Sequence, residues 1–437
     1  MYPRRSGFRD PVVNARPVPS YTPDAPAALA AIPGRVFIIN RYFYPDESAT
    51  AQIAADLALY LANQQVRVIG IASRAVYDDP AGLLPAHEVI GTLQIDRLGT
   101  TRFGRASLPG RMIDYLSFYA LALVYLTRHL RRGDIVICKT DPPMLSVIGA
   151  VAAGLRGAKL INWLQDVFPE IAVRLEVVRL PTLVVGVLRR IRNWSLKSAA
   201  ANVVIGQRMR NHLLGEHISA ANIHVIPNWS REVVQPVAAA RQTLRAEWGY
   251  TSDDLVVGYS GNLGRGHDYQ VVLDAAAALA AHPRIRFLMV GGGAAMVACR
   301  EQVAQRGLSN VQFQPYQPVE RLAETLSVPD IHWVTLKPDL EGLLLPSKIY
   351  GIAAVARPFI FIGAPDGEQA VLVRQWDAGF AITPDDGAGL VALLTTIDAD
   401  RVGLQAMGGN ARTMLDSFSS VNALAQWSAL LAAVGGR

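Results

Sequence analysis

Carboxylate residues follow one of the short apolar runs of this sequence. The run 158–163 (AKLINW) is typical of a buried strand, and Gln165-Asp166-Val167-Phe168-Pro169-Glu170 comes directly after it. A carboxylate in such a loop can orient or deprotonate an acceptor hydroxyl. Capping of the next helix is the alternative, and it suits Glu170 better than Asp166. We therefore take Asp166 as the candidate catalytic residue.

A glycine-rich turn follows a second strand-like run. Residues 255–259 (LVVGY) lead into SGNLGRG, which contains Gly261, Asn262, Gly264 and Arg265, and a helical pattern begins near residue 269. Glycines let the backbone approach a phosphate, and a helix N-terminus supplies free N–H groups. Arg265 would add a cation. The pattern favours a phosphate-binding loop, with a plain strand–helix turn as the alternative.

Three further residues are candidates for binding the same ligand. Lys348 lies beside Pro-Ser at a predicted helix start, in the segment EGLLLPSKIY that begins with Glu341. A lysine there is well placed to meet a diphosphate, whereas a solvated surface lysine is the ordinary alternative. Glu368 ends the loop GAPDGE after the strand-like run 359–362, where a carboxylate can accept hydrogen bonds from sugar or ribose hydroxyls. A first-turn helix acid is the competing interpretation of Glu368.

Other residue patterns argue against metal or redox chemistry. The eight histidines form no metal-ligand motif, and the two cysteines, Cys138 and Cys299, lie far apart. Gly291-Gly292-Gly293 lacks the spacing of a dinucleotide fingerprint and is interpreted as a turn. We expect no metal site and no bound cofactor.

Strand-like and helical segments alternate along most of the chain, and the alternation restarts once. Apolar runs near residues 36, 68, 135 and 160 form one block, and runs near 257, 288, 333 and 360 form another. This pattern predicts an α/β protein of two Rossmann-like units with doubly wound parallel sheets and one cleft between them. We divide the chain into a flexible leader (1–32), an N-terminal domain (33–230), a C-terminal domain (231–410) and a last helix (411–437) that returns to the N-terminal domain.

Charge is distributed unevenly between the two predicted domains. Residues 1–230 contain 26 Lys and Arg against 16 Asp and Glu, whereas residues 231–437 contain 16 against 20. Two basic, apolar stretches lie in the positive half, Arg102–Arg132 and Leu180–Lys197. Such stretches suit the surface of an anionic membrane, and a core helix with a basic outer face is the alternative. No run reaches the length of a transmembrane helix, and we see no signal peptide.

These motifs, in this order, resemble glycosyltransferase family 4, and most closely its branch for O-antigen, capsule and exopolysaccharide synthesis. The supporting segments are 44–50, 166–170, 226–229, 259–264 and 341–350. The resemblance implies the GT-B fold and transfer with retention of anomeric configuration. It implies a nucleotide diphosphate sugar as donor, here a UDP-sugar, with no essential metal.

The same resemblance implies roles for several residues. The loop after the first strand, with Asp46, Glu47 and Thr50, approaches donor and acceptor. Gly261 to Arg265 and Lys348 hold the diphosphate, and Asp166 occupies the place of a catalytic-site His or Asp. One departure stands out, because family members carry two glutamates with seven residues between them, and the corresponding positions here are Leu343 and Gly351. Glu368 is then a candidate to replace part of the second glutamate's role in ribose recognition.

The expected activity is therefore transfer of a hexose-type sugar to a lipid-linked saccharide. We expect the enzyme to be cytoplasmic and peripheral to the inner face of the cytoplasmic membrane, with no nucleic acid as partner. A nucleotide-sugar 2-epimerase of the same fold is one alternative. A degenerate, non-catalytic subunit of a polysaccharide synthesis complex is the other.

Overall fold

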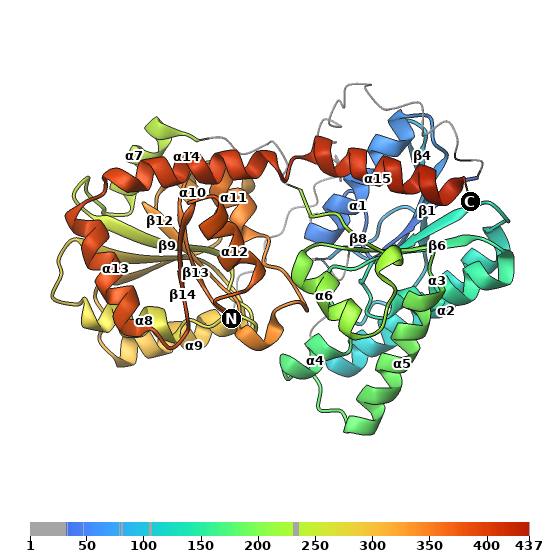
Figure 1. Cartoon of the computed structure of the whole chain (residues 1–437), viewed down its shortest axis with the longest axis horizontal. Helices are drawn as coiled ribbons and strands as arrows, with labels where there is room; N and C mark the ends of the chain where they lie inside the picture. The colour runs from blue at the N-terminus through green and yellow to red at the C-terminus, as the bar shows by residue number, and fades with distance from the viewer. Residues whose placement is uncertain are drawn as a thin grey trace.

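The computed structural model folds into two α/β domains that lie side by side (Figure 1). It describes residues 32, 34–46, 48–77, 79, 82–104, 107–229 and 236–436. The predicted leader (1–32) therefore lies almost entirely outside the described residues, and so does the predicted boundary at 230/231. Each domain has its own sheet, and both sheets are covered by helices on two faces, so the predicted α/β class with two Rossmann-like units is confirmed.

The N-terminal sheet has the strand order β3-β4-β2-β1-β5-β6-β7-β8. The strands are β1 (Val36–Ile39), β2 (Val68–Ser73), β3 (His87–Ile90), β4 (Leu93–Leu98), β5 (Ile135–Cys138), β6 (Lys159–Trp163), β7 (Ala201–Val204) and β8 (Ile223–Val225). The central strands are apolar at nearly every position because helices cover both faces. The sheet is not wholly parallel as predicted, since the edge strand β3 pairs antiparallel with β4.

The described residues of the N-terminal domain form six α-helices. They are α1 (Ala49–Asn63), α2 (Leu108–His129), α3 (Leu145–Arg156), α4 (Glu170–Arg174), α5 (Thr182–Ser198) and α6 (Gln207–Gly215). Helices α2, α3 and α5 pack side by side in one layer. The two basic stretches of the sequence correspond to α2 and α5. Among the described residues, no helix is both long and apolar enough to cross a membrane.

The C-terminal sheet is parallel, with the order β11-β10-β9-β12-β13-β14. Its strands are β9 (Leu255–Asn262), β10 (Ile285–Gly292), β11 (Val311–Gln314), β12 (Ile331–Thr335), β13 (Phe359–Ile362) and β14 (Gly379–Ile382). The helices around it are α7 (Ala238–Glu247), α8 (Gln270–Ala278), α9 (Ala294–Gln305), α10 (Leu322–Ser327), α11 (Lys348–Ala354), α12 (Glu368–Gln375), α13 (Gly387–Ala399) and α14 (Val402–Asp416).

The last helix, α15 (Ser420–Gly435), lies on the N-terminal domain (Figure 1). The Trp427 ring lies 4.6 Å from that of Trp163, and Lys159 Nζ donates to the carbonyl of Val434 at 2.7 Å. The chain crosses back later than residue 411, where we drew the boundary. Ala411 and Met414 still pack in the C-terminal domain, because α14 covers α11 there.

A shared apolar cluster joins the two domains. Side chains from the N-terminal domain, including Val167 and Met209, pack with Leu340, Leu343 and Phe361 of the C-terminal domain. Because these side chains are almost fully buried, the domains meet in a closed arrangement. The contact lies beside the carboxyl ends of β6 and β12, where an α/β fold places its ligands.

Candidate active site

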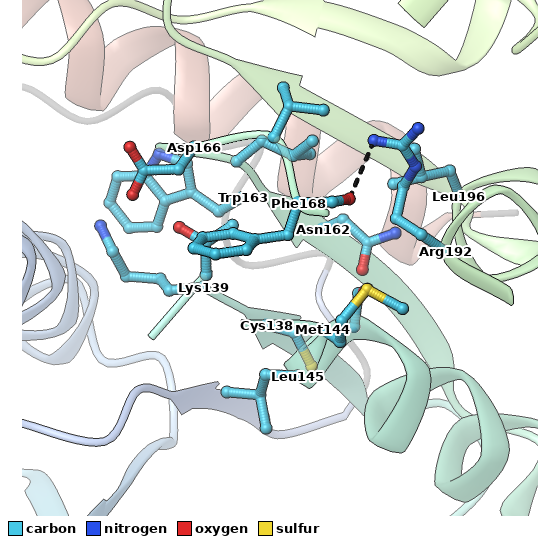
Figure 2. A pocket seen from close by; sticks show the side chains of 14 residues that line it. Cys138, Lys139, Met144, Leu145, Asn162, Trp163, Asp166, Phe168, Arg192 and Leu196 are labelled. Carbon is cyan, nitrogen blue, oxygen red and sulfur yellow. Dashed lines mark hydrogen bonds between the residues drawn. The ribbon is translucent and has the colours of Figure 1, made fainter. Parts of the chain in front are cut away.

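Asp166 lies in the loop after β6, at one end of a small cavity (Figure 2). The cavity has a volume of about 20 Å³, room for one water molecule. Lys139, which follows β5, and Trp163, which ends β6, line it beside Asp166, and Arg192 of α5 lines the other end in this view. Asp166 is half-buried and Lys139 is fully buried, so a carboxylate and an amine share a poorly solvated corner.

Burial is the main electrostatic influence on this corner. Burial, the largest influence, and the nearby Asp141 carboxylate together raise the pKa of Asp166 from 3.8 to about 6, while Lys139 opposes the rise. Burial likewise lowers the pKa of Lys139 well below its ordinary value, against the attraction of Asp166 and Asp56. Lys139 Nζ lies 3.5 Å from the centre of the Trp163 ring and has no hydrogen-bond partner among the described residues. A carboxylate with a pKa near 6 can accept a proton at neutral pH.

A buried amide pair holds the loop that carries Asp166. Gln165 Nε2 donates to Asn228 Oδ1 at 3.1 Å, and Asn228 Nδ2 donates back to Gln165 Oε1 at 2.7 Å. The next residue, Trp229, donates to Asp56 at 3.2 Å. Segments 165–170 and 226–229 are far apart in sequence, so this pairing explains why both occur among the motifs.

The glycines at the carboxyl end of β9 lie beside those at the carboxyl end of β10. Gly261 pairs in register with Gly291, and a Cβ on Gly291 would stand 2.3 Å from the Gly261 carbonyl oxygen, so only glycine fits there. Gly261 itself has φ 118°, which side chains rarely adopt. The triple glycine, interpreted above as a plain turn, therefore forms part of the same backbone surface. Asn262 and Gly264 continue this surface along the carboxyl edge of the sheet.

Lys348 is the first residue of α11, and its side chain passes over Gly261. Lys348 Nζ lies 3.1 Å from His267 Nε2, and His267 Nδ1 lies 2.7 Å from the Thr335 carbonyl oxygen. The carbonyl requires a proton on Nδ1, which leaves Nε2 as acceptor for the lysine. Burial and the neighbouring lysine lower the pKa of His267 to about 4, and burial lowers that of Lys348 to about 8. At neutral pH this pair is a neutral imidazole orienting a cation.

Glu341 and Glu368 occupy helix ends in the interface. Glu368 N donates to Glu341 Oε1 at 2.7 Å, so Glu341 caps α12. The Glu368 carboxylate accepts from the backbone N–H groups of Gln207 at 3.0 Å and Arg208 at 2.8 Å, and thereby caps α6 of the other domain. Both glutamates bind backbone in this closed arrangement. Burial raises the pKa of Glu341, and its Oε2 has no partner among the described residues.

The loop after β1 is pinned by one carboxylate. Asp46 accepts from the backbone N–H groups of Ser48 at 2.9 Å and Tyr77 at 2.8 Å, and is almost fully buried. Thr50 is half-buried in the first turn of α1. Glu47 lies outside the described residues. Gly351, where the family resemblance requires a glutamate, faces α10, and a Cβ there would stand 3.1 Å from Leu326 Cδ1.

Two contacts bring the Asp166 and Lys348 regions together. Val167 N donates to the Leu343 carbonyl at 2.9 Å, which joins the loop of Asp166 to the segment that leads into Lys348. Arg265, which is exposed, donates to the Glu176 carbonyl at 3.2 Å. Arg265 thus bridges the domains here, rather than lying against Lys348.

A cluster of potential metal ligands lies behind this site. Glu170, His212 and Glu216 offer ligand atoms within 4.8 Å of one another. The two carboxylates, however, form ion pairs with Arg189 and Arg192. The arrangement is a charge network between α4, α5 and α6, and we assign no metal to it.

Sequence reasoning missed Lys139 and His267 as residues of this site, and it included Asn228 only within the supporting segment 226–229. Lys139 ends an otherwise apolar strand-like run, which was a signal of a buried cation. His267 follows the glycine-rich segment directly, and its position two residues after Arg265 was the available clue. The partner of Asn228 is 63 residues away, so no local pattern identifies the pair.

Comparison with known proteins agrees with this geometry. Residues 240–414 match the family described as Glycosyl transferases group 1, and they contain the glycine loop, Lys348, Glu341 and Glu368. The chain is 26% identical over 295 residues to the probable glycosyltransferase WbjE of Pseudomonas aeruginosa, covering 67% of this chain and 72% of that protein. This chain is a glycosyltransferase with the GT-B fold. The expectation of such an enzyme is thereby confirmed, and the epimerase is not favoured.

Other relatives of this glycosyltransferase differ in coverage. The putative colanic acid biosynthesis glycosyl transferase WcaI of Escherichia coli is 34% identical over 153 residues, which is 35% of this chain and 37% of that protein. Sucrose-phosphate synthase from Thermosynechococcus elongatus superposes with a TM-score of 0.71 at 18% identity, over 91% of this chain and 98% of that one. HepE of Anabaena, solved with UDP and glucose, gives 0.65 at 16% identity, over 91% and 98%. These structural likenesses establish the fold.

Proposed function

We propose that this glycosyltransferase moves a hexose from a UDP-sugar to a lipid-linked saccharide during assembly of a bacterial surface polysaccharide, with retention of configuration. The observation that carries the proposal is the hydrogen bond from Val167 to Leu343. It joins the candidate acceptor-side residue, Asp166, to the segment that positions the candidate diphosphate-binding residue, Lys348. The name of WcaI, a putative colanic acid biosynthesis glycosyl transferase, supports the class of pathway.

The residues divide the reaction between the two domains. The backbone of Gly261 to Gly264 and the Lys348 ammonium receive the diphosphate, since both lie at the carboxyl edge of the C-terminal sheet. Asp166 orients the acceptor hydroxyl. The bond from the anomeric carbon to the diphosphate breaks, the bond to the acceptor oxygen forms on the same face, and the hydroxyl proton leaves towards the departing phosphate. The nucleoside diphosphate is then released, and no metal ion takes part.

A membrane-facing surface supports the lipid-linked acceptor. Helix α5 exposes an apolar row that consists of Leu183, Val184, Val187, Ile191 and Trp194. Helix α2 exposes another row, which consists of Leu108, Met112, Ile113, Leu116, Leu121 and Val124. Arg190 and Lys197 are exposed along the α5 row, where they can meet anionic headgroups.

One part of the basic-helix hypothesis is wrong. Arg192 is only 4% exposed and pairs with Glu170 and Glu216, so it cannot face a bilayer. Arg189 is bound to the same two glutamates. Only two cations of α5, Arg190 and Lys197, are therefore available for the proposed surface.

The test separates donor binding from turnover. Lys348→Ala should weaken UDP affinity roughly 10- to 100-fold, because a charge-assisted hydrogen bond contributes about 1.5–3 kcal/mol. Asp166→Asn should lower kcat by roughly 10²–10⁴ while UDP affinity stays near that of the wild type. Lys337→Ala, which removes an exposed lysine, is the matched control. Unchanged UDP affinity in Lys348→Ala, or unchanged kcat in Asp166→Asn, would refute the assigned roles.

A further inference from the structure

A second pocket lies in the C-terminal domain, at the opposite edge of the sheet from the donor loops. Its volume is about 580 Å³, and its walls include Asp330, just before β12, and Arg357, just before β13. Arg241 of α7 and Arg401, at the start of α14, complete the charged lining. The strands of this sheet are parallel, so their amino ends lie far from the carboxyl edge. The pocket is therefore separate from the proposed donor site.

Positive charge exceeds negative charge in this pocket. The Asp330 carboxylate is shared by Arg241 and by Arg245, a neighbouring residue of α7. Arg357 makes no side-chain hydrogen bond or ion pair among the described residues, and its buried Nε is unpaired, as is that of Arg241. Three guanidinium groups thus surround one carboxylate. An unpaired buried donor costs free energy, which a ligand with acceptor oxygens would recover.

Arg401 does not add to this excess. Its guanidinium already binds the Asp398 carboxylate and the carbonyls of Asp253 and Asp254. Arg357 is the group left without a counter-charge: burial and the neighbouring Arg241 lower its pKa to about 10, although Asp330 opposes this. At that pKa the guanidinium remains charged at neutral pH.

Close packing of α14 against the residue before Arg357 forms one wall of the pocket. A Cβ on Gly408 would stand 2.2 Å from the Ala356 carbonyl oxygen, so only glycine allows α14 to approach the residue before Arg357 this closely. Gly409, which lines the pocket, faces open space. The volume falls within the usual range for small-molecule sites, about 300–1,000 Å³.

We propose that this pocket is a second ligand site of the enzyme, and that Arg357 and Arg241 bind a dianionic phosphate group in it. A phosphate supplies three or more acceptor oxygens, and guanidinium groups bind it through paired N–H donors. The two negative charges of the ligand match the excess of three guanidinium groups, those of Arg241, Arg245 and Arg357, over the single Asp330 carboxylate. The phosphate is either inorganic phosphate or the phosphate of a small sugar ester. The site does not depend on the proposed donor or acceptor.

The pocket lies beside two segments that lead to the N-terminal domain. Pro236 lines it where the chain enters α7 after crossing from the N-terminal domain. Gln405 lines it on α14, the helix that leads to α15 on the N-terminal domain. A bound phosphate would therefore lie beside the start of α7 and beside α14.

The test is phosphate binding to the full chain, measured by calorimetry and by thermal unfolding. The parent is Lys348→Ala, so that binding at the proposed diphosphate site is weakened. Inorganic phosphate and glucose 1-phosphate are compared with sodium chloride at equal ionic strength. We expect at least one phosphate to raise the unfolding midpoint above that in chloride. Adding Arg357→Gln should weaken its binding roughly tenfold or more, because a charge-assisted contact is lost.

Arg412→Gln is the matched control, since Arg412 is an exposed arginine of α14 that does not line the pocket. It should bind phosphate like the parent. If Arg357→Gln does not fold, Arg241→Gln takes its place, because Arg245 still pairs with Asp330. Protection by both phosphates identifies the phosphate group as the ligand, and protection by the ester alone identifies a sugar phosphate. The same midpoint in phosphate and chloride, or full binding in the arginine variants, would overturn the proposal.

Discussion

Replacing Asp166 by asparagine should make the protein more stable at neutral pH while it impairs turnover. In the folded state, burial raises the pKa of Asp166 from 3.8 to about 6. Below pH 4 the carboxyl group is protonated in both the folded and the unfolded state, so it imposes no electrostatic penalty. As the pH rises through 4 to 6, the unfolded state gains the charge first, and the folded state becomes less stable by comparison. The asparagine side chain carries no charge, so the variant escapes this penalty.

The size of the effect follows from the pKa change. About two pKa units at about 1.4 kcal/mol each correspond to about 3 kcal/mol at pH 8, and to about half of that at pH 5. For a domain of 150–250 residues, about 1 kcal/mol moves the unfolding midpoint by about 2–4 °C. Asp166→Asn should therefore raise the midpoint of the N-terminal domain by about 6–12 °C at pH 8.

The assay is thermal and urea unfolding of wild type and variant at pH 5 and pH 8. Asp339→Asn, which removes an exposed carboxylate, is the control and should change stability little at either pH. A gain in stability that is equal at both pH values would show that asparagine merely packs better. A loss of stability at pH 8 would refute the idea that the Asp166 carboxylate is held in a poorly solvated corner.

Three further predictions concern the donor lysine, the domain interface and the membrane surface. Burial lowers the pKa of Lys348 to about 8, so the side chain loses its charge as the pH rises past 8. Titration calorimetry should therefore show weaker UDP binding at pH 9 than at pH 7. Unchanged affinity would exclude a role for this charge. Glu368→Ala should lower the free energy of unfolding by about 1–2 kcal/mol and speed amide hydrogen exchange at Gln207, because α6 loses its cap. Unaltered exchange would contradict the interdomain contact. Reversing the charges of Arg190 and Lys197 together should reduce co-sedimentation with anionic liposomes and leave UDP affinity intact; equal binding to neutral and anionic vesicles would argue against the surface.

Most strongly apolar strands could be predicted from local sequence, although the fully buried β7 was not among them, and weakly patterned strands could not. The strand-like runs around residues 37, 70, 161 and 360 all form strands, because each is an uninterrupted apolar segment that a doubly covered sheet requires. The edge pair β3 and β4 was missed, since its outer strand alternates exposed and half-buried residues. Strand β14, a short half-buried segment that begins at Gly379, was also missed. Edge strands carry weak patterns because the core contacts only part of them.

Some site residues could likewise be predicted from local sequence, whereas their contacts could not. Gly261 and Lys348 were found because a strand–glycine–helix sequence is a local device for binding phosphate. Their contact with each other, and the part played by His267, depend on how α11 packs over β9. Glu368 was selected as a ligand for sugar or ribose, whereas in this closed structure it binds the backbone of α6 in the other domain.

By itself, the sequence determined the two α/β domains, the glycine loop and the acidic loop, because each depends on neighbouring residues and on the period of the apolar pattern. Only the tertiary structure decided which charges are buried. Lys139 and Asp166 share a poorly solvated corner because β5 and β6 are adjacent, and Arg192 turns inward because Glu170 and Glu216 lie beneath α5. Burial and pairing of charges depend on distances between segments that are remote in sequence, and those distances arise only when the sheets and helices pack.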